Sequence, residues 1–164
     1  MRKNDDNALQ IVLLAIEIEL RCSLLYQEWA LRFKPYDYGV SVLLEGLADE
    51  EREHAEEFRA LQEEISSDEV PEDMALPPMF GACMKKLETI QDHFFVTSPV
   101  MASTILETAL EIEHFTCQLY KDLEPKTSNS AVATVCHRLS KHEENHANIL
   151  VERLEFEKQN VSPN

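Results

Sequence analysis

The stretch AIEIELRCSLLY, residues 15–26, decides the fold, because the chain repeats it as ALEIEHFTCQLY at residues 109–120. Six of the twelve positions are identical, including two glutamates two residues apart and a closing tyrosine. A second pair follows in the same order: LADEEREHAEEF at residues 47–58 and LSKHEENHANIL at residues 139–150, each with a Glu-x-x-His spacing. The sequence therefore indicates a duplicated helical hairpin.

Apolar residues recur at three- and four-residue spacing over four long stretches, and no stretch alternates with period two, so the pattern predicts an all-α protein. We expect helices from about Asp5 or Asn7 to Phe33, from about Val42 to Ile65, from a cap at Ser98 and Pro99 to about Glu124, and from the end of residues 127–130 to about Glu157. A long crossing, with a short helix within residues 81–95, joins the halves. The expected fold is a four-helix bundle of two antiparallel hairpins joined by this crossing, with residues 1–164 as one domain.

Composition narrows the classes of partner and compartment. The 31 acidic against 15 basic residues give a formal charge of −16, which repels nucleic acid and anionic membrane surfaces. The sequence has no apolar run of membrane-spanning length and no leader-like first segment, so we expect a cytoplasmic protein with no membrane or nucleic-acid partner. The cysteines form no C-x-x-C pair and predict free thiols; they are Cys22, Cys83, Cys117 and Cys136.

Only one glutamate of each repeated pair can face the core, because residues two apart do not share a helix face. The positions three, four and seven residues from Glu19, and likewise from Glu113, are mostly apolar or small. Polar residues surround Glu17 and Glu111 instead. We therefore expect Glu19 and Glu113 to point inward, and Glu17 and Glu111 to meet solvent or a partner chain.

The Glu-x-x-His pairs also lie on apolar stripes. Glu51 and His54 share one stripe, and Glu143 and His146 share the other. Four carboxylates in one core would repel one another unless cations neutralised them, and two divalent ions would do so. One glutamate from each of two helices and a Glu-x-x-His from each of the other two is the ligand set of di-iron carboxylate bundles. The competing interpretation is an acidic bundle with solvated glutamates and incidental histidines.

This order of residues, with Tyr26 seven residues after the first glutamate, resembles the ferritin-like superfamily over about residues 5–157. Within that superfamily it is most similar to rubrerythrin-like proteins that lack a rubredoxin domain. The resemblance implies two iron ions, with manganese or a mixed pair as alternatives. The implied metal ligands are Glu19, Glu51, His54, Glu113, Glu143 and His146. Tyr26 and Tyr120 are the catalytic candidates beside them, with core packing as the alternative role.

The resemblance also implies an activity: oxidation of ferrous iron coupled to reduction of peroxide or dioxygen, with electrons from a separate donor. The alternative is a protein that binds, stores or delivers iron without turnover. Two departures narrow the expectation. Leu110 stands where rubrerythrins carry a further inward glutamate, and Arg52 stands where bacterioferritins carry the haem-binding methionine. We therefore expect neither a seventh carboxylate ligand nor haem.

Two further groups of residues have more than one possible role. Glu107, Glu111 and His114 follow one line of a helix and would suit either an accessory metal site or a solvated face. Cys22 and Cys117 flank the expected site, where small buried hydrophobes are the ordinary interpretation.

The first helix is apolar on a second face, which predicts an assembly. The residues on the Glu17 side are Leu13, Leu14, Leu20 and Leu24. Either the crossing segment with Phe94 and Phe95 or a second subunit would cover them. We expect a homodimer.

Overall fold

The computed structural model describes residues 3–66, 81–82, 85–86, 88–89 and 102–160. Within these ranges the chain forms four long helices and no strand. The elements are α1 Lys3–Phe33, α2 Tyr38–Ile65, α4 Ala102–Leu123, the short 3-10 helix η1 Glu124–Lys126 and α5 Ser130–Asn160. The prediction of an all-α, four-helix protein is confirmed.

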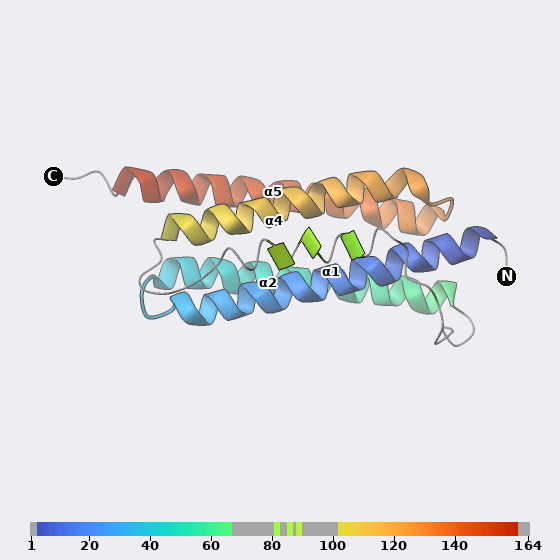
Figure 1. Ribbon diagram of the computed structural model, residues 1–164, viewed down its shortest axis with the longest axis horizontal. Coiled ribbons are helices and arrows are strands. Elements are labelled where there is room, and N and C mark those ends of the chain that lie inside the picture. Colours follow the sequence, from blue (N-terminus) through green and yellow to red (C-terminus); the bar gives the residue numbers. More distant parts are fainter. Residues whose placement is uncertain (1–2, 67–80, 83–84, 87, 90–101, 161–164) are drawn as a thin grey trace.

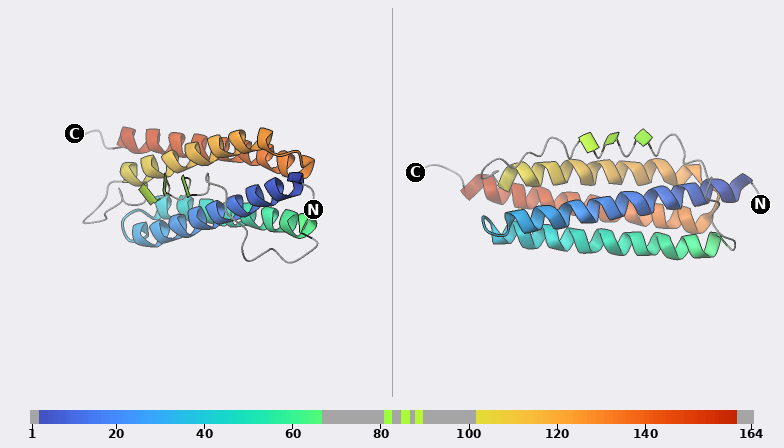
Figure 2. Two further views of the ribbon diagram at one scale, coloured as in Figure 1. Left: turned by 45° about the vertical axis from the view of Figure 1, so that its right-hand side comes forward. Right: turned by 60° about the horizontal axis from the view of Figure 1, so that its bottom comes forward.

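The helices pack as two hairpins laid side by side (Figures 1 and 2). α1 packs mainly on α2, and α4 packs mainly on α5. Each hairpin is antiparallel, whereas α2 and α4 run in the same direction along the bundle (Figure 1). α2 therefore ends, and α4 begins, at opposite ends of the long axis. Of the predicted crossing helix, residues 81–82, 85–86 and 88–89 are helical, and the rest lies outside the described residues, as do Ser98 and Pro99.

One continuous core runs between the hairpins and takes side chains from all four helices. Each helix contributes an apolar stripe at three- and four-residue spacing, as expected for a helix that buries one broad face. The largest fully buried side chains include Tyr26, Phe58 and Tyr120. Phe58 and Tyr120 stack with their ring centroids 5.8 Å apart, which joins α2 of one hairpin to α4 of the other.

The start of α2 differs from the prediction, since it begins at Tyr38 rather than near Val42. Asp37 caps it: one carboxylate oxygen accepts a hydrogen bond from the Val40 backbone N–H at 2.9 Å. The same oxygen lies 3.5 Å from Arg153 on α5. A Cβ at Gly39 would come within 3.1 Å of the Arg153 guanidinium, so glycine keeps this arginine close to the cap.

The other described boundaries lie close to the predicted ones. α4 ends at Leu123, and the turn that follows it contains Pro125. The side chain of Asn129 then accepts hydrogen bonds from the backbone N–H groups of Ala131 and Val132, which fixes the start of α5.

Two matching side-chain contacts fix the register of the two hairpins. In the first hairpin the Ser23 hydroxyl donates to the Ala48 carbonyl at 2.6 Å. In the second, the Cys117 thiol donates to the Ser140 carbonyl at 3.3 Å. Ser23 and Cys117 are equivalent in the sequence repeat, and so are Ala48 and Ser140. The duplication therefore extends from the sequence to the contacts that hold each helix pair.

The second apolar face of α1 is smaller than predicted. Leu14 is fully buried in the core, so the expectation that it lies on the outer face was wrong. Its neighbours Leu13 and Leu20 are half-buried, and Leu24 is 66% exposed. The outer apolar face of α1 therefore contains Leu13, Leu20 and Leu24, but not Leu14.

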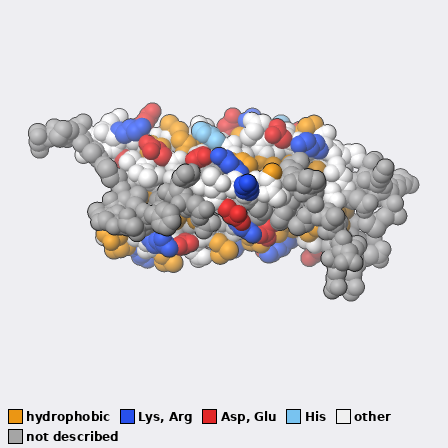
Figure 3. Space-filling view, viewed as in Figure 1, with side chains coloured by type: hydrophobic (Ala, Val, Ile, Leu, Met, Phe, Trp, Pro, Cys, Tyr) orange, Lys and Arg blue, Asp and Glu red, His pale blue; other side chains and the backbone are white. Residues whose placement is uncertain are grey.

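Charged side chains of both signs are interspersed with apolar ones over the described part of the face seen in Figure 3. None of the described helices combines the length and the apolar character that crossing a membrane requires.

Adjacent residues of α5 offer a direct test of this packing. Leu150 is fully buried, whereas Ile149 is 45% exposed. We expect Leu150→Ala to lower the free energy of unfolding by about 2–5 kcal/mol, because it leaves a cavity in the core. Ile149→Ala should change it by less than about 0.5 kcal/mol. Urea unfolding of both variants measures the difference, and equal losses would contradict the assigned face of α5.

Candidate metal centre

The structure brings the six predicted ligands together at the middle of the core. All are nearly inaccessible to solvent: Glu19 0%, Glu51 2%, His54 3%, Glu113 0%, Glu143 0% and His146 2% exposed. Their ligand atoms form two overlapping groups, each confined within 4.8 Å. One group contains Glu19, Glu51, His54 and Glu143, and the other contains Glu51, Glu113, Glu143 and His146. Glu51 and Glu143 belong to both.

The first group surrounds His54 Nδ1. This nitrogen lies 3.1 Å from Glu51 Oε2, 3.3 Å from Glu143 Oε1 and 3.5 Å from Glu19 Oε2. The ligands come from α2, α5 and α1, so this half of the centre draws on both hairpins.

The second group repeats this arrangement around His146 Nδ1. Here the distances are 3.2 Å to Glu113 Oε2, 3.3 Å to Glu51 Oε1 and 3.5 Å to Glu143 Oε2. Glu51 and Glu143 thus turn one oxygen toward each histidine, as bridging carboxylates do. Glu19 and Glu113 each serve one half and would be terminal ligands.

Protons on the two histidines cannot provide a hydrogen bond for every carboxylate oxygen in the centre. A protonated imidazole has one N–H at Nδ1, and three carboxylate oxygens face that position in each half. Glu19 Oε2 and Glu143 Oε1 are buried and accept no hydrogen bond from the described residues. Both of these oxygens face His54. A cation at this position would contact them together.

The spacing and chemistry of the donor atoms also suit metal ions. Neighbouring ligand atoms bound about 2.1 Å from an octahedral ion lie about 3 Å apart. The distances of 3.1–3.5 Å from the two Nδ1 atoms are close to that value. The donor set is carboxylate and imidazole without thiolate, which disfavours a thiolate-preferring metal. The residues therefore fit a pair of divalent ions.

Burial shapes the protonation of the cluster. It raises the pKa of Glu51 well above its usual range, and the other carboxylates add to this effect. It also raises the pKa of Glu113 to about 8. For Glu143 burial acts in the same direction, but the two nearby histidines, whose Nδ1 atoms lie 3.3 Å and 3.5 Å from its oxygens, outweigh it and lower the pKa.

The two imidazoles show the opposite balance. Burial alone would lower the pKa of His54, but the three carboxylates that face its Nδ1 atom raise it to about 12. The pKa of His146 is raised for the same reasons. Protons therefore balance part of the negative charge at neutral pH. Divalent ions would displace these protons, so metal affinity should fall as the pH falls.

Tyr26 and Tyr120 contact the two terminal carboxylates across the centre. The Tyr26 hydroxyl donates to Glu113 Oε1, and the Tyr120 hydroxyl donates to Glu19 Oε1. Burial and the nearby carboxylates raise the pKa of both phenols, so each keeps its proton and remains a donor. The geometry supports a role in orienting Glu19 and Glu113, and a redox role stays a prediction.

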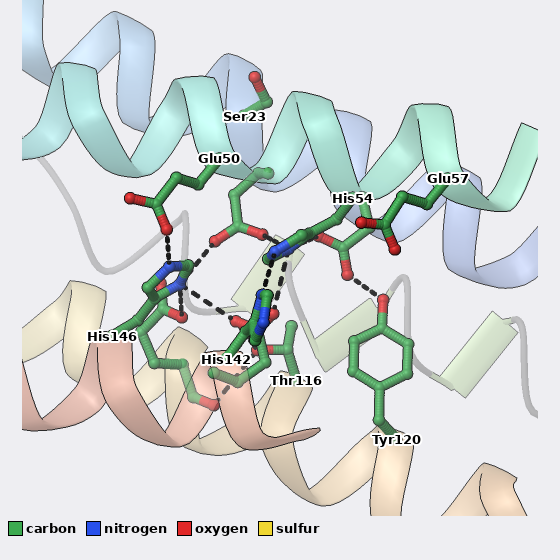
Figure 4. A network of polar contacts seen from close by, with 12 residues as sticks. Ser23, Glu50, His54, Glu57, Thr116, Tyr120, His142 and His146 are labelled. Carbon is green, nitrogen blue, oxygen red and sulfur yellow. Dashed lines mark hydrogen bonds and ion pairs between the residues drawn. The ribbon is translucent and has the colours of Figure 1, made fainter. Parts of the chain in front are cut away.

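Glu50 and His142 also belong to the centre, and the sequence analysis missed both (Figure 4). The far nitrogen of His146, Nε2, lies 2.6 Å from Glu50 Oε2. The far nitrogen of His54 lies 3.2 Å from His142 Nδ1. Each residue directly precedes the glutamate of a Glu-x-x-His pair, so the repeat itself could have identified them as equivalent.

The remaining candidates belong to neither of the two groups of ligand atoms. Glu17 pairs with Arg21 at 2.7 Å, and Glu111 pairs with Lys86 at 3.0 Å, both at the surface. His114 is exposed and joins no group of metal-binding residues among those described. Cys22 is buried, and burial together with the Glu51 carboxylate raises its pKa, so its sulfur stays protonated.

No family model, no curated protein and no solved structure matches this chain.

Neighbouring glutamates on the same helices test the ligand assignment. We expect Glu19→Gln and Glu113→Gln each to lower bound metal by about half or more, because each removes a charged terminal ligand from one half of the centre. Glu17→Gln and Glu111→Gln are matched controls. Each of these glutamates lies two residues before the tested one on the same helix, and its carboxylate is at the surface. Elemental analysis after anaerobic loading with ferrous iron gives the metal content. Equal metal content in all four variants would contradict the assignment.

Proposed function

We propose that this chain is a di-iron carboxylate protein that couples oxidation of ferrous iron to reduction of peroxide or dioxygen. The observation that carries the proposal is the sharing of Glu51 and Glu143 between two equivalent groups of ligand atoms. A mononuclear site needs no such sharing. Manganese or a mixed pair would fit the same donor atoms.

A pair of ferrous ions, when bound, supplies the two electrons that convert one peroxide and two protons into two waters. The chain holds the ligands for this task in a dry core, where Tyr26 and Tyr120 keep the terminal carboxylates oriented. Among the residues that touch the two imidazoles, Glu50 is exposed and His142 is half-buried. Among the described residues, solvent therefore comes close to the imidazoles between α2 and α5, the helices that carry Glu50 and His142 (Figure 4). Small oxidants would enter on this side.

Renewed turnover needs electrons from outside, and we propose a separate donor protein. No contact among the described residues identifies this donor. The experiment therefore uses a chemical one-electron donor.

Peroxide consumption distinguishes an enzyme from an iron-binding protein. The protein is loaded anaerobically with ferrous iron, and hydrogen peroxide is added with an excess of a reduced dye as electron donor. We expect many peroxide molecules to be consumed per chain, above the background of a Glu19→Gln/Glu113→Gln double variant. Consumption that stops at one peroxide per two irons would instead support storage or delivery of iron. A protein that retains no iron would reject both roles.

We also propose that the protein forms a homodimer through the outer face of α1. Leu24 and Leu31 are 66% and 62% exposed and lie two turns apart on this helix, so they share a face. Phe94 and Phe95, the other predicted cover for this face, lie outside the described residues.

Light scattering behind a sizing column tests the assembly. We expect a mass of twice the 18.9 kDa of one chain at micromolar concentration. Leu24→Ser combined with Leu31→Ser should shift the protein to the single-chain mass, because both residues then cease to favour burial. Ile149→Ser on α5 is the matched control. A single-chain mass for the unmodified protein would reject the dimer.

A further inference from the structure

The two halves of the metal centre match closely around each Nδ1 atom and differ most at the outer side of each histidine. In both halves an Nδ1 atom faces one terminal and two bridging carboxylates, and a tyrosine donates to the terminal one. The outer contacts differ. His146 Nε2 lies 2.6 Å from a carboxylate oxygen of Glu50, whereas His54 Nε2 lies 3.2 Å from Nδ1 of His142. Glu50 and His142 occupy equivalent positions in the repeat.

This difference changes the strength of the two histidines as ligands. An imidazole that binds a metal through Nδ1 carries its proton on Nε2 and donates it outward. For His146 the acceptor is a carboxylate oxygen of Glu50 at 2.6 Å, and a carboxylate partner on the outer nitrogen makes a metal-binding imidazole a stronger base. For His54 the contact is with a ring nitrogen of His142, at the longer distance of 3.2 Å. His146 is therefore the better ligand of the two.

A second difference between the halves acts in the other direction but is weaker. The Thr116 hydroxyl lies 3.3 Å from Glu143 Oε2, on the His146 side, and its single proton is shared with the closer carbonyls of Ile112 and Glu113 at 3.1 Å and 3.2 Å. When it donates to Glu143, it draws electron density from a bridging oxygen. The equivalent residue of the first hairpin is Cys22, for which the structure gives no such hydrogen bond. A long hydrogen bond between a neutral hydroxyl and a shared carboxylate counts for less than a short charge-assisted one at a terminal imidazole. The carboxylate of Glu50 also adds negative charge near the His146 position.

We infer that the two metal positions are unequal: the position at His146 fills first and holds its ion more tightly, because Glu50 orients and polarises His146. The ion at His54, backed by His142, is the exchangeable one. Glu50 and His142 act through the histidines and are positioning residues. The inference rests on the proposed function, since it requires that the centre binds two ions. It predicts that one chain can hold a singly loaded state or two different metals.

Titration with zinc, followed by NMR of protein labelled with ¹⁵N in its imidazoles, tests the order of filling. Zinc is diamagnetic, so the signals of His54 and His146 stay visible and report which ring binds. We expect the His146 signals to change during the first equivalent and the His54 signals during the second. Glu50→Gln should weaken the first step by about 10–100-fold and leave the second nearly unchanged. His142→Glu should strengthen the second step.

Glu53→Gln is the matched control, because Glu53 is an exposed carboxylate one turn from Glu50 on the same helix. It should leave both steps unchanged. The inference is rejected if His54 fills first, if both positions fill together in the unmodified protein, or if Glu50→Gln has no more effect than the control. Absence of any zinc binding would reject the proposed function instead, so the two failures are distinguishable.

Discussion

Four carboxylates buried in one helical core are the constraint on which the rest of this structure depends. An ionised carboxylate that leaves water loses several kcal/mol of solvation, and four in contact add mutual repulsion. The bundle provides a partner for each of them: an imidazole, a phenol or both. These partners reach the carboxylates only if all four helices keep one register. The contacts of Ser23 and Cys117 with the neighbouring helices fix that register on either side.

The register between the hairpins matters as much as the register within them. Each half of the centre combines ligands of both hairpins, since Glu143 of α5 serves His54 and Glu51 of α2 serves His146. Neither hairpin can therefore complete a half by itself. The stacked pair of Phe58 and Tyr120 lies across the same boundary and ties the apolar packing to the position of a terminal ligand. The packing of the core and the positions of the candidate ligands therefore depend on each other in this fold.

The sequence predicted most of this arrangement because the duplicated pattern and the helical period reinforce each other. Periodicity separated Glu19 from Glu17 and Glu113 from Glu111, and the structure buries the first of each pair. The sequence analysis predicted two features wrongly: the start of α2 and the burial of Leu14. The early start of α2 depends on the Asp37 cap and its contact with Arg153, which is distant in sequence. Leu14 lies at the edge of a stripe, where a small rotation of the helix decides burial.

The sequence analysis missed the contacts of Glu50 and His142 with the two histidines for a different reason. Periodicity assigns a residue to a face, but a long side chain on the edge of that face can still reach inward. Glu50 is exposed and nevertheless contacts His146, so a classification by face alone places it in solvent. The repeat offered a better indication, because it aligns Glu50 with His142 one residue before each buried glutamate.

That alignment also shows what a single chain can do that a pair of identical hairpins cannot. Two copies of one hairpin, assembled about a twofold axis, must carry the same amino acid on both sides of the axis, so any mutation alters both sides at once. Joining the copies covalently removes this restriction, and each side can then change independently. The glutamate at one position and the histidine at its counterpart are a divergence of this kind. Gene fusion, in this view, turns a symmetric centre into one with two chemically distinct ends.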